Sequence, residues 1–180
     1  MKSDNMYKED TTFDITSQIR QIRKESIKQI LLDLDAVGHR QEYVATIDSV
    51  MYYNDSGAES VNATWFTFEN IVAPVVWIAG GNDKKTRYEE LMPKAVNHVK
   101  AIVCIGDSKR LHQAFDDSKI EIFEADDMRE AVDMASVIAH DNEIVLLSPA
   151  CKPNRCFCDF ADRGNQFKNH VYRLQNERHQ

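Results

Sequence analysis

The chain has 180 residues, of which 43% are apolar, 28% are charged and 9% are aromatic, and these proportions are typical of a globular protein. Its 22 lysine and arginine residues against 29 aspartate and glutamate residues leave a net charge of −7. Because nucleic-acid affinity depends on basic patches, and no basic block is longer than Lys84–Lys85, we expect no nucleic-acid partner. No apolar run is long enough to span a membrane and the N-terminus is polar, so we predict a cytoplasmic protein without a membrane segment.

The four cysteines do not predict a disulfide framework or a metal site. Cys104 lies in an apolar run, and Cys151, Cys156 and Cys158 are close together in the sequence. Cys156 and Cys158 are separated by one residue, which is shorter than the usual zinc-ligand spacing, and no matching second pair follows.

The first 18 residues are polar and lack strong periodicity. An amphipathic helix is predicted over about 20–34, because the apolar residues follow the spacing of one helix face. These residues are Ile27, Ile30, Leu31 and Leu34. Next, Tyr43–Ile47 and Val50–Tyr53 are short β-prone runs that predict a hairpin.

From there on, apolar runs typical of buried strands alternate with helical segments. The predicted strands are 74–79, 101–105, 120–123 and 144–147, and the predicted helices are 60–71, 87–98, 108–116, 127–139 and 159–175. Thr86–Glu89 and Asp127–Glu130 have the spacing of N-terminal capping boxes. This alternation predicts an α/β fold, with a mostly parallel sheet covered on both faces. We expect one domain over 36–180, with a helical extension over 1–35.

In such a sheet, ligands bind beyond the carboxyl ends of the strands. The loops Asn54–Gly57, Gly80–Lys85 and Ser148–Cys151 follow predicted strands. Two glycines and Lys84 near a helix start suit a small carboxylate or phosphate anion. Alternatively, Gly80–Gly81 is only a tight turn and Lys84 a solvated side chain. The chain contains no Gly-x-x-x-x-Gly-Lys-Ser/Thr phosphate loop, no Gly-x-Gly-x-x-Gly fingerprint and no Gly-x-Ser-x-Gly elbow, so we assign no catalytic residue.

Taken together, these segments resemble the Mur ligases, and most closely the members that add D-glutamate. Five motifs occur in the family's order: His39-Arg40, Tyr53–Ser56, Val75–Lys84, Leu146–Cys151 and Asp162–Phe167. The resemblance covers about 20–175 and implies a Rossmann-like, three-layer C-terminal domain. Residues 1–35 would then match the end of the central domain.

In that family, ATP and Mg²⁺ activate a carboxylate during peptidoglycan-precursor synthesis, and an amino acid attacks the acyl phosphate. Other domains supply the phosphate loop and bind the UDP-sugar. The resemblance therefore implies that this chain needs a partner carrying an ATP-binding domain and binds no cofactor alone. It places His39, Arg40 and Asp55 toward the nucleotide, and Lys84 and Phe160 at the amino acid.

Three positions depart from the family's motifs. Gly57 stands in place of a lysine, Glu59 in place of a substrate-binding threonine, and Pro153 in place of a substrate-binding serine. Glu59 would repel a substrate carboxylate, and Pro153 offers no side-chain donor, so we expect D-glutamate to bind poorly. Lys152 and Arg155 add positive charge to the same loop, which suits a different anion unless both are simply solvated.

Three functional hypotheses stay open at this point. The chain is a non-catalytic domain that binds a partner, or it is a subunit of a split ATP-dependent ligase. The third hypothesis is a small-anion binding module built on Gly80–Gly81.

Overall fold

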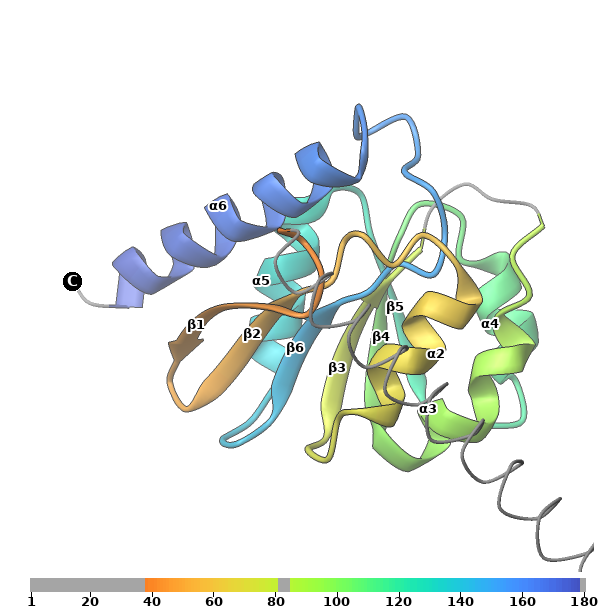
Figure 1. Cartoon of the computed structure of the whole chain (residues 1–180). Coiled ribbons are helices and arrows are strands. Elements are labelled where there is room, and N and C mark those ends of the chain that lie inside the picture. The colour runs from red at the N-terminus through yellow and green to blue at the C-terminus, as the bar shows by residue number, and fades with distance from the viewer. Residues whose placement is uncertain (1–37, 81–84, 179–180) are drawn as a thin grey trace, which may run out of the picture. The chain divides into compact units, whose positions relative to one another are not determined.

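A computed structural model of the chain describes residues 38–80 and 85–178 (Figure 1). Within these ranges, six strands form one sheet in the order β1-β2-β6-β3-β4-β5. They are β1 (Glu42–Ile47), β2 (Val50–Asn54), β3 (Val75–Ala79), β4 (Val99–Ile105), β5 (Glu121–Ala125) and β6 (Ile144–Leu147). The predicted helix over about 20–34 and the predicted boundary near residue 36 lie outside the described residues.

Only the first two of these strands are antiparallel, and they form the predicted hairpin, with Ile47 opposite Val50. The two turn residues, Asp48 and Ser49, both have positive φ angles of 48° and 63°, as a tight two-residue hairpin turn requires. The β2–β6, β6–β3, β3–β4 and β4–β5 pairs are all parallel. The prediction of a mostly parallel sheet is therefore confirmed.

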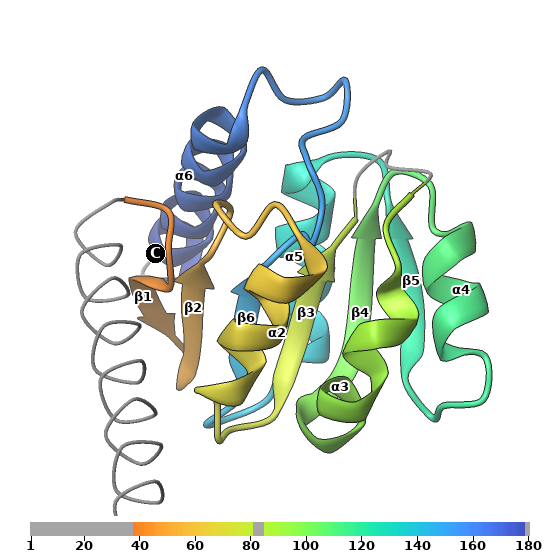
Figure 2. The same cartoon turned by 45° about the vertical axis from the view of Figure 1, so that its right-hand side comes forward.

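Helices cover the two faces of the sheet and make three layers. They are α2 (Val61–Glu69), the 3₁₀ turn η1 (Tyr88–Leu91), α3 (Met92–His98), α4 (Lys109–Phe115), α5 (Met128–Ile138) and α6 (Phe160–Arg178). Helices α5 and α6 lie on one face, and α2, α3 and α4 lie on the other (Figures 1 and 2). None of the helices in the two described stretches is both long and apolar enough to cross a bilayer.

The central strand β3 shows why this sheet needs helices on both sides. All five of its residues are buried, and its side chains alternate between two apolar clusters. Val76 and Ile78 pack with residues of α5 and α6, whereas Trp77 packs edge-on against Phe68 and Phe115 at centroid distances of 5.2 and 6.2 Å. A strand that is apolar on both faces is stable only where both faces are covered.

One of the two predicted helix starts is correct. Asp127 caps α5, because its carboxylate accepts the N–H of Glu130 at 2.9 Å. The predicted capping box at Thr86 is wrong. Thr86 is buried and lies one residue too early, and the segment begins as a 3₁₀ turn whose N-cap, Arg87, makes no side-chain capping bond.

Candidate functional site

The predicted loops come together at one edge of the sheet. Strands β2, β6 and β3 are parallel neighbours, so their carboxyl ends share that edge (Figure 2). Backbone hydrogen bonds join the loops there: the N–H of Asp55 donates to Leu147 at 2.7 Å, and that of Gly80 donates to Pro149 at 3.4 Å. The topology thus places the segments after three strands in one cluster, as expected for a parallel sheet.

Asp55 lies at the centre of this cluster and has no solvent exposure. The hydroxyls of Thr67 and Ser148 donate to its Oδ2 atom at 2.6 and 2.8 Å. The N–H of Gln41 donates to Oδ1 at 3.3 Å, and Nη1 of Arg40 lies 3.1 Å from the same oxygen. Both carboxylate oxygens therefore face protein groups in this conformation.

Burial and the neighbouring groups shift the pKa of Asp55 in opposite directions. Burial is the largest influence and raises the pKa of Asp55, whereas Arg40 and the two hydroxyl donors act to lower it. Nη1 of Arg40 is itself buried and makes no hydrogen bond of acceptable geometry. The contact between Arg40 and Asp55 is thus an ion pair held by charge rather than by a well-aligned hydrogen bond.

Ser148 extends the cluster into the core. Because its hydroxyl proton goes to Asp55, the hydroxyl of Thr64 donates to Ser148 Oγ across 2.9 Å. The indole N–H of Trp77 donates to the Ser148 carbonyl at 2.6 Å. The sequence analysis missed Thr64 and Thr67. Their i, i+3 spacing on α2, which places both hydroxyls on one helix face, was the available signal.

His39 and Phe160, which the sequence analysis assigned to different ligands, lie in contact with each other. Their rings lie edge to face at 6.1 Å between centroids. Nδ2 of Asn54 donates to His39 Nδ1 at 2.9 Å and to Glu42 at 2.8 Å, so neutral His39 carries its proton on Nε2. Burial, with a smaller contribution from Lys168, lowers the pKa of His39.

Arg163 is the main residue that the sequence analysis overlooked, although it lies in a quoted motif. Its side chain is 1% exposed. Nε and Nη2 donate to the hydroxyl and carbonyl of Ser56 at 2.9 and 2.7 Å, and Nη1 donates to the carbonyl of Cys151 at 3.2 Å. The Ser56 hydroxyl in turn donates to the carbonyl of Phe160 at 2.7 Å. Arg163 therefore ties the loops after β2 and β6 to the start of α6.

A pocket of about 260 Å³ opens between these loops. It is lined by Glu59, Ser60, Val61, Asn62, Lys85, Thr86, Arg87, Glu90 and Ala150. Arg87 is already paired with Glu90 at 2.5 Å, and Glu59 is a second acidic residue among those that line the pocket. Glu59, which is one of the predicted site positions, therefore lines this pocket together with Lys85, Thr86 and Arg87, the residues that follow Lys84.

The remaining predicted positions are placed as follows. Gly57 is half-buried beside Arg40, and Pro153 is half-buried in the connection from β6 to α6. Lys84 lies outside the described residues. Lys152 and Arg155 are exposed. In the parts of the chain that the structure describes, no group of three or more histidine, cysteine or acidic side chains is placed to hold a metal ion.

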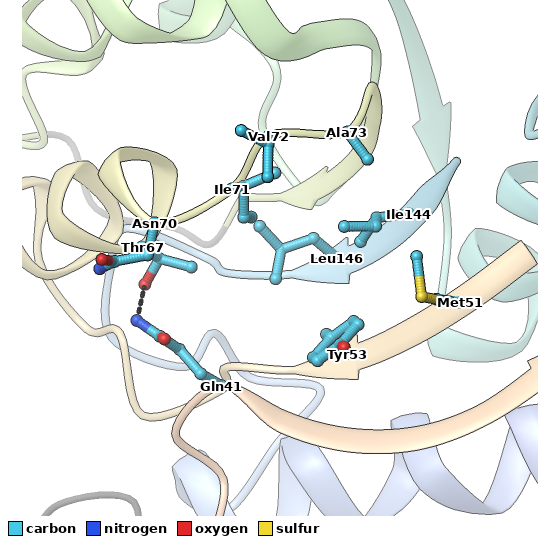
Figure 3. A pocket seen from close by; sticks show the side chains of 10 residues that line it. All are labelled: Gln41, Met51, Tyr53, Thr67, Asn70, Ile71, Val72, Ala73, Ile144 and Leu146. Atoms are coloured by element: carbon cyan, nitrogen blue, oxygen red, sulfur yellow. Dashed lines mark hydrogen bonds between the residues drawn. The ribbon is translucent and has the colours of Figure 1, made fainter. Parts of the chain in front are cut away.

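A second hollow of about 280 Å³ lies between α2 and strands β2 and β6 (Figure 3). It is lined by Gln41, Met51, Tyr53, Thr67, Asn70, Ile71, Val72, Ala73, Ile144 and Leu146. The amide of Gln41 donates to Thr67 at 3.4 Å, so Thr67 belongs both to this groove and to the Asp55 cluster. None of the ten lining side chains is charged, and the Asp55 cluster with the Glu59 pocket remains the better candidate site.

The chain is similar to proteins of one known family. The family model of the Mur ligase glutamate ligase domain matches residues 39–151. The UDP-N-acetylmuramoylalanine–D-glutamate ligases of Christiangramia forsetii and Porphyromonas gingivalis are 40% and 37% identical over 161 residues, which are 89% of this chain and 36% of each relative. The chain thus spans about a third of their length.

A solved structure has the same fold. The UDP-N-acetylmuramate–alanine ligase of Thermotoga maritima aligns with a TM-score of 0.52 and 13% identity, over 77% of this chain and 30% of that protein. The family match covers more than half of the residues and includes the loops that carry Asp55, Glu59 and Ser148. The chain therefore belongs to the Mur ligase family, as a glutamate ligase domain.

Proposed function

We propose that this chain is a Mur-ligase C-terminal domain that contributes half of a ligase site and does not form an amide bond by itself. Its 180 residues contain no Gly-x-x-x-x-Gly-Lys-Ser/Thr stretch, so the triphosphate and Mg²⁺ of the family's reaction need residues from elsewhere. The chain also spans only about a third of its ligase relatives. Both observations support a dependence on a separate ATP-binding domain.

We also propose that the pocket beside Glu59 does not accept D-glutamate well. The observation that carries this proposal is that Glu59 is one of the residues that line the pocket, at the position where the resemblance puts a threonine. Two like charges at close range in a partly screened site repel by about 1 to 4 kcal/mol. A substrate with a carboxylate at this point would lose that much relative to one with a neutral or cationic group.

Calorimetry on the full chain tests both statements. We expect no heat of binding with millimolar D-glutamate or ATP, and measurable D-glutamate binding by the Glu59→Thr variant. Glu69→Thr is the matched control, because Glu69 is an exposed carboxylate that pairs with Lys94 outside the pocket. Clear binding of D-glutamate by the unmodified chain would contradict the proposal.

The second candidate function is a subunit of a split ATP-dependent amino-acid ligase. Its support is the retention of side chains that the resemblance places toward the nucleotide, namely His39, Arg40 and Asp55, and of Lys84, which it places at the amino acid. The structure holds Arg40 against Asp55 at 3.1 Å. In a mixture with a chain that carries the phosphate-loop domain, amide formation should appear, and Lys84→Ala should abolish it. The matched control is Lys119→Ala, since Lys119 is exposed on the loop before β5. Absence of turnover with every such partner removes this candidate.

A further inference from the structure

Gly57 provides the space in which the side chain of Arg40 lies. A Cβ atom added to Gly57 would be 2.8 Å from Cδ and 3.3 Å from Cγ of Arg40. The closer of these distances is shorter than any ordinary contact between carbon atoms. The stem of Arg40 therefore passes directly over the one residue of this loop that has no side chain.

The backbone around Gly57 is less free to move than Arg40. The same added Cβ would be 3.1 Å from the carbonyl oxygen of His39, and that carbonyl accepts the N–H of Gly57 at 2.8 Å. Since a hydrogen bond holds the two backbone segments together and the arginine stem is flexible, a side chain at position 57 would displace Arg40 first.

In this position the guanidinium of Arg40 forms an ion pair with the carboxylate of Asp55. Nη1 of Arg40 lies 3.1 Å from Oδ1 of Asp55, with the two side chains 14% and 0% exposed. The pairing is imperfect, because the buried Nη1 makes no well-aligned hydrogen bond. The residues on either side of Arg40, His39 and Gln41, have positive φ angles of 73° and 45°, a backbone conformation that is strained for residues other than glycine.

Asp55 does not need Arg40 to stay hydrogen-bonded. If Arg40 left, Oδ2 would still accept from Thr67 and Ser148, and Oδ1 would still accept from the N–H of Gln41. Breaking the ion pair would therefore leave no carboxylate oxygen without a donor. A state in which Arg40 has left Asp55 would therefore keep this carboxylate hydrogen-bonded.

We propose that Gly57 holds this site in a self-occluded state, in which Arg40 folds across the loop onto Asp55 and an incoming anion must compete with that carboxylate for the arginine. The pairing itself is independent of the proposed function, whereas its consequence for a ligand rests on it. Any side chain at position 57 would shift the population toward the open state.

Nuclear magnetic resonance on the full chain tests the pairing without a ligand. In Gly57→Ala, the Arg40 Nε–H signal should move to the position of a solvent-exchanging arginine, and the Asp55 carboxyl carbon should titrate at higher pH than in the unmodified chain. The matched control is Gly38→Ala, because a Cβ at Gly38 meets no atom within 4 Å. The inference is overturned if Gly57→Ala leaves both signals as they are in the control.

A double-mutant cycle keeps the test decisive if the loop is perturbed by alanine. Arg40→Gln should by itself raise the pH at which the Asp55 carboxyl titrates. Adding Gly57→Ala to this variant should then cause no further change. A further shift in the double variant would show that Gly57 acts by another route and would overturn the inference.

Binding of inorganic pyrophosphate separates this inference from the proposed function. We expect Gly57→Ala to bind it about tenfold more tightly than the unmodified chain, as for a site that is open about a tenth of the time. Release of Arg40 in the spectra with no pyrophosphate binding by either protein would uphold the self-occluded pair and contradict the nucleotide-facing role. Equal and measurable affinity in both proteins would overturn the occlusion.

Discussion

Arg163→Met should destabilise the chain by about 3 kcal/mol. The arginine donates to the carbonyls of Ser56 and Cys151 and to the Ser56 hydroxyl, at 2.7 to 3.2 Å. Methionine fills part of the same volume but leaves the two carbonyls without this donor, at about 1 to 3 kcal/mol each. The Ser56 hydroxyl keeps its bond to Phe160. Removing a buried cation offsets part of the loss, since burial disfavours the charge and lowers the pKa of Arg163.

Urea unfolding of the full chain, followed by circular dichroism, measures this effect. With a slope of about 1.5 kcal/mol per molar urea, the expected loss lowers the midpoint by about 2 M. Arg129→Met is the control, because Arg129 is an exposed helix residue whose carboxylate partner, Asp133, is 3.9 Å away, and its loss should change stability by less than about 0.5 kcal/mol. Equal midpoints for the two variants would refute the view that Arg163 holds the loops together.

Three further expectations concern other buried groups. Because burial raises the pKa of Asp55, the folded chain takes up this proton at a higher pH than the unfolded chain, so Asp55 adds stability as the pH falls toward about 4. Asp55→Asn should therefore lose stability more steeply than the unmodified chain in unfolding at several pH values between about 7 and 4, and parallel curves would contradict this. Gly164→Ala should cost about 1 to 3 kcal/mol in urea unfolding, since its Cβ would clash with Nδ1 of His39, and a similar cost in a His39→Ala background would argue against the clash. Burial raises the pKa of the Cys104 thiol to about 12, so mass spectrometry should find the exposed Cys156 alkylated at neutral pH and Cys104 unmodified, and rapid labelling of Cys104 would exclude its burial.

The strands were predictable because short apolar runs between turn signals are typical of strands buried in a sheet. Ile144–Leu147 is buried at all four positions, and so short a run between turn signals fits a central strand better than a helix. The helix start near Thr86 was not predictable from spacing, because capping depends on where the backbone turns. The side chain that the pattern assigned to the cap is buried instead.

The loops of the site were predictable from topology, but their chemistry was not. The rule for parallel sheets places Asp55 and Ser148 at one edge whatever their partners are. Which donors reach Asp55 depends on the rotation of α2, and the contact of Arg163 with Ser56 joins residues 107 positions apart in the chain. Single-sequence patterns contain no information on such a pairing, and a buried arginine has the same local signal as an exposed one.

Burial separates the site positions that match the family's motifs from Glu59 and Pro153, which depart from them. The motif residues that match the family, Asp55, Ser148 and Arg163, are buried and donate to or accept from one another's loops. Replacing any one of them leaves a buried polar group unpaired, at about 1 to 3 kcal/mol, which is a large part of the stability of a domain. Glu59 and Pro153 are half-buried at the rim, where a new side chain costs the fold little. The fold therefore constrains the anchor of the site, while the groups that would meet a substrate can change without it. Binding measurements on variants at positions 59 and 153 should therefore show which chemical groups this site accepts.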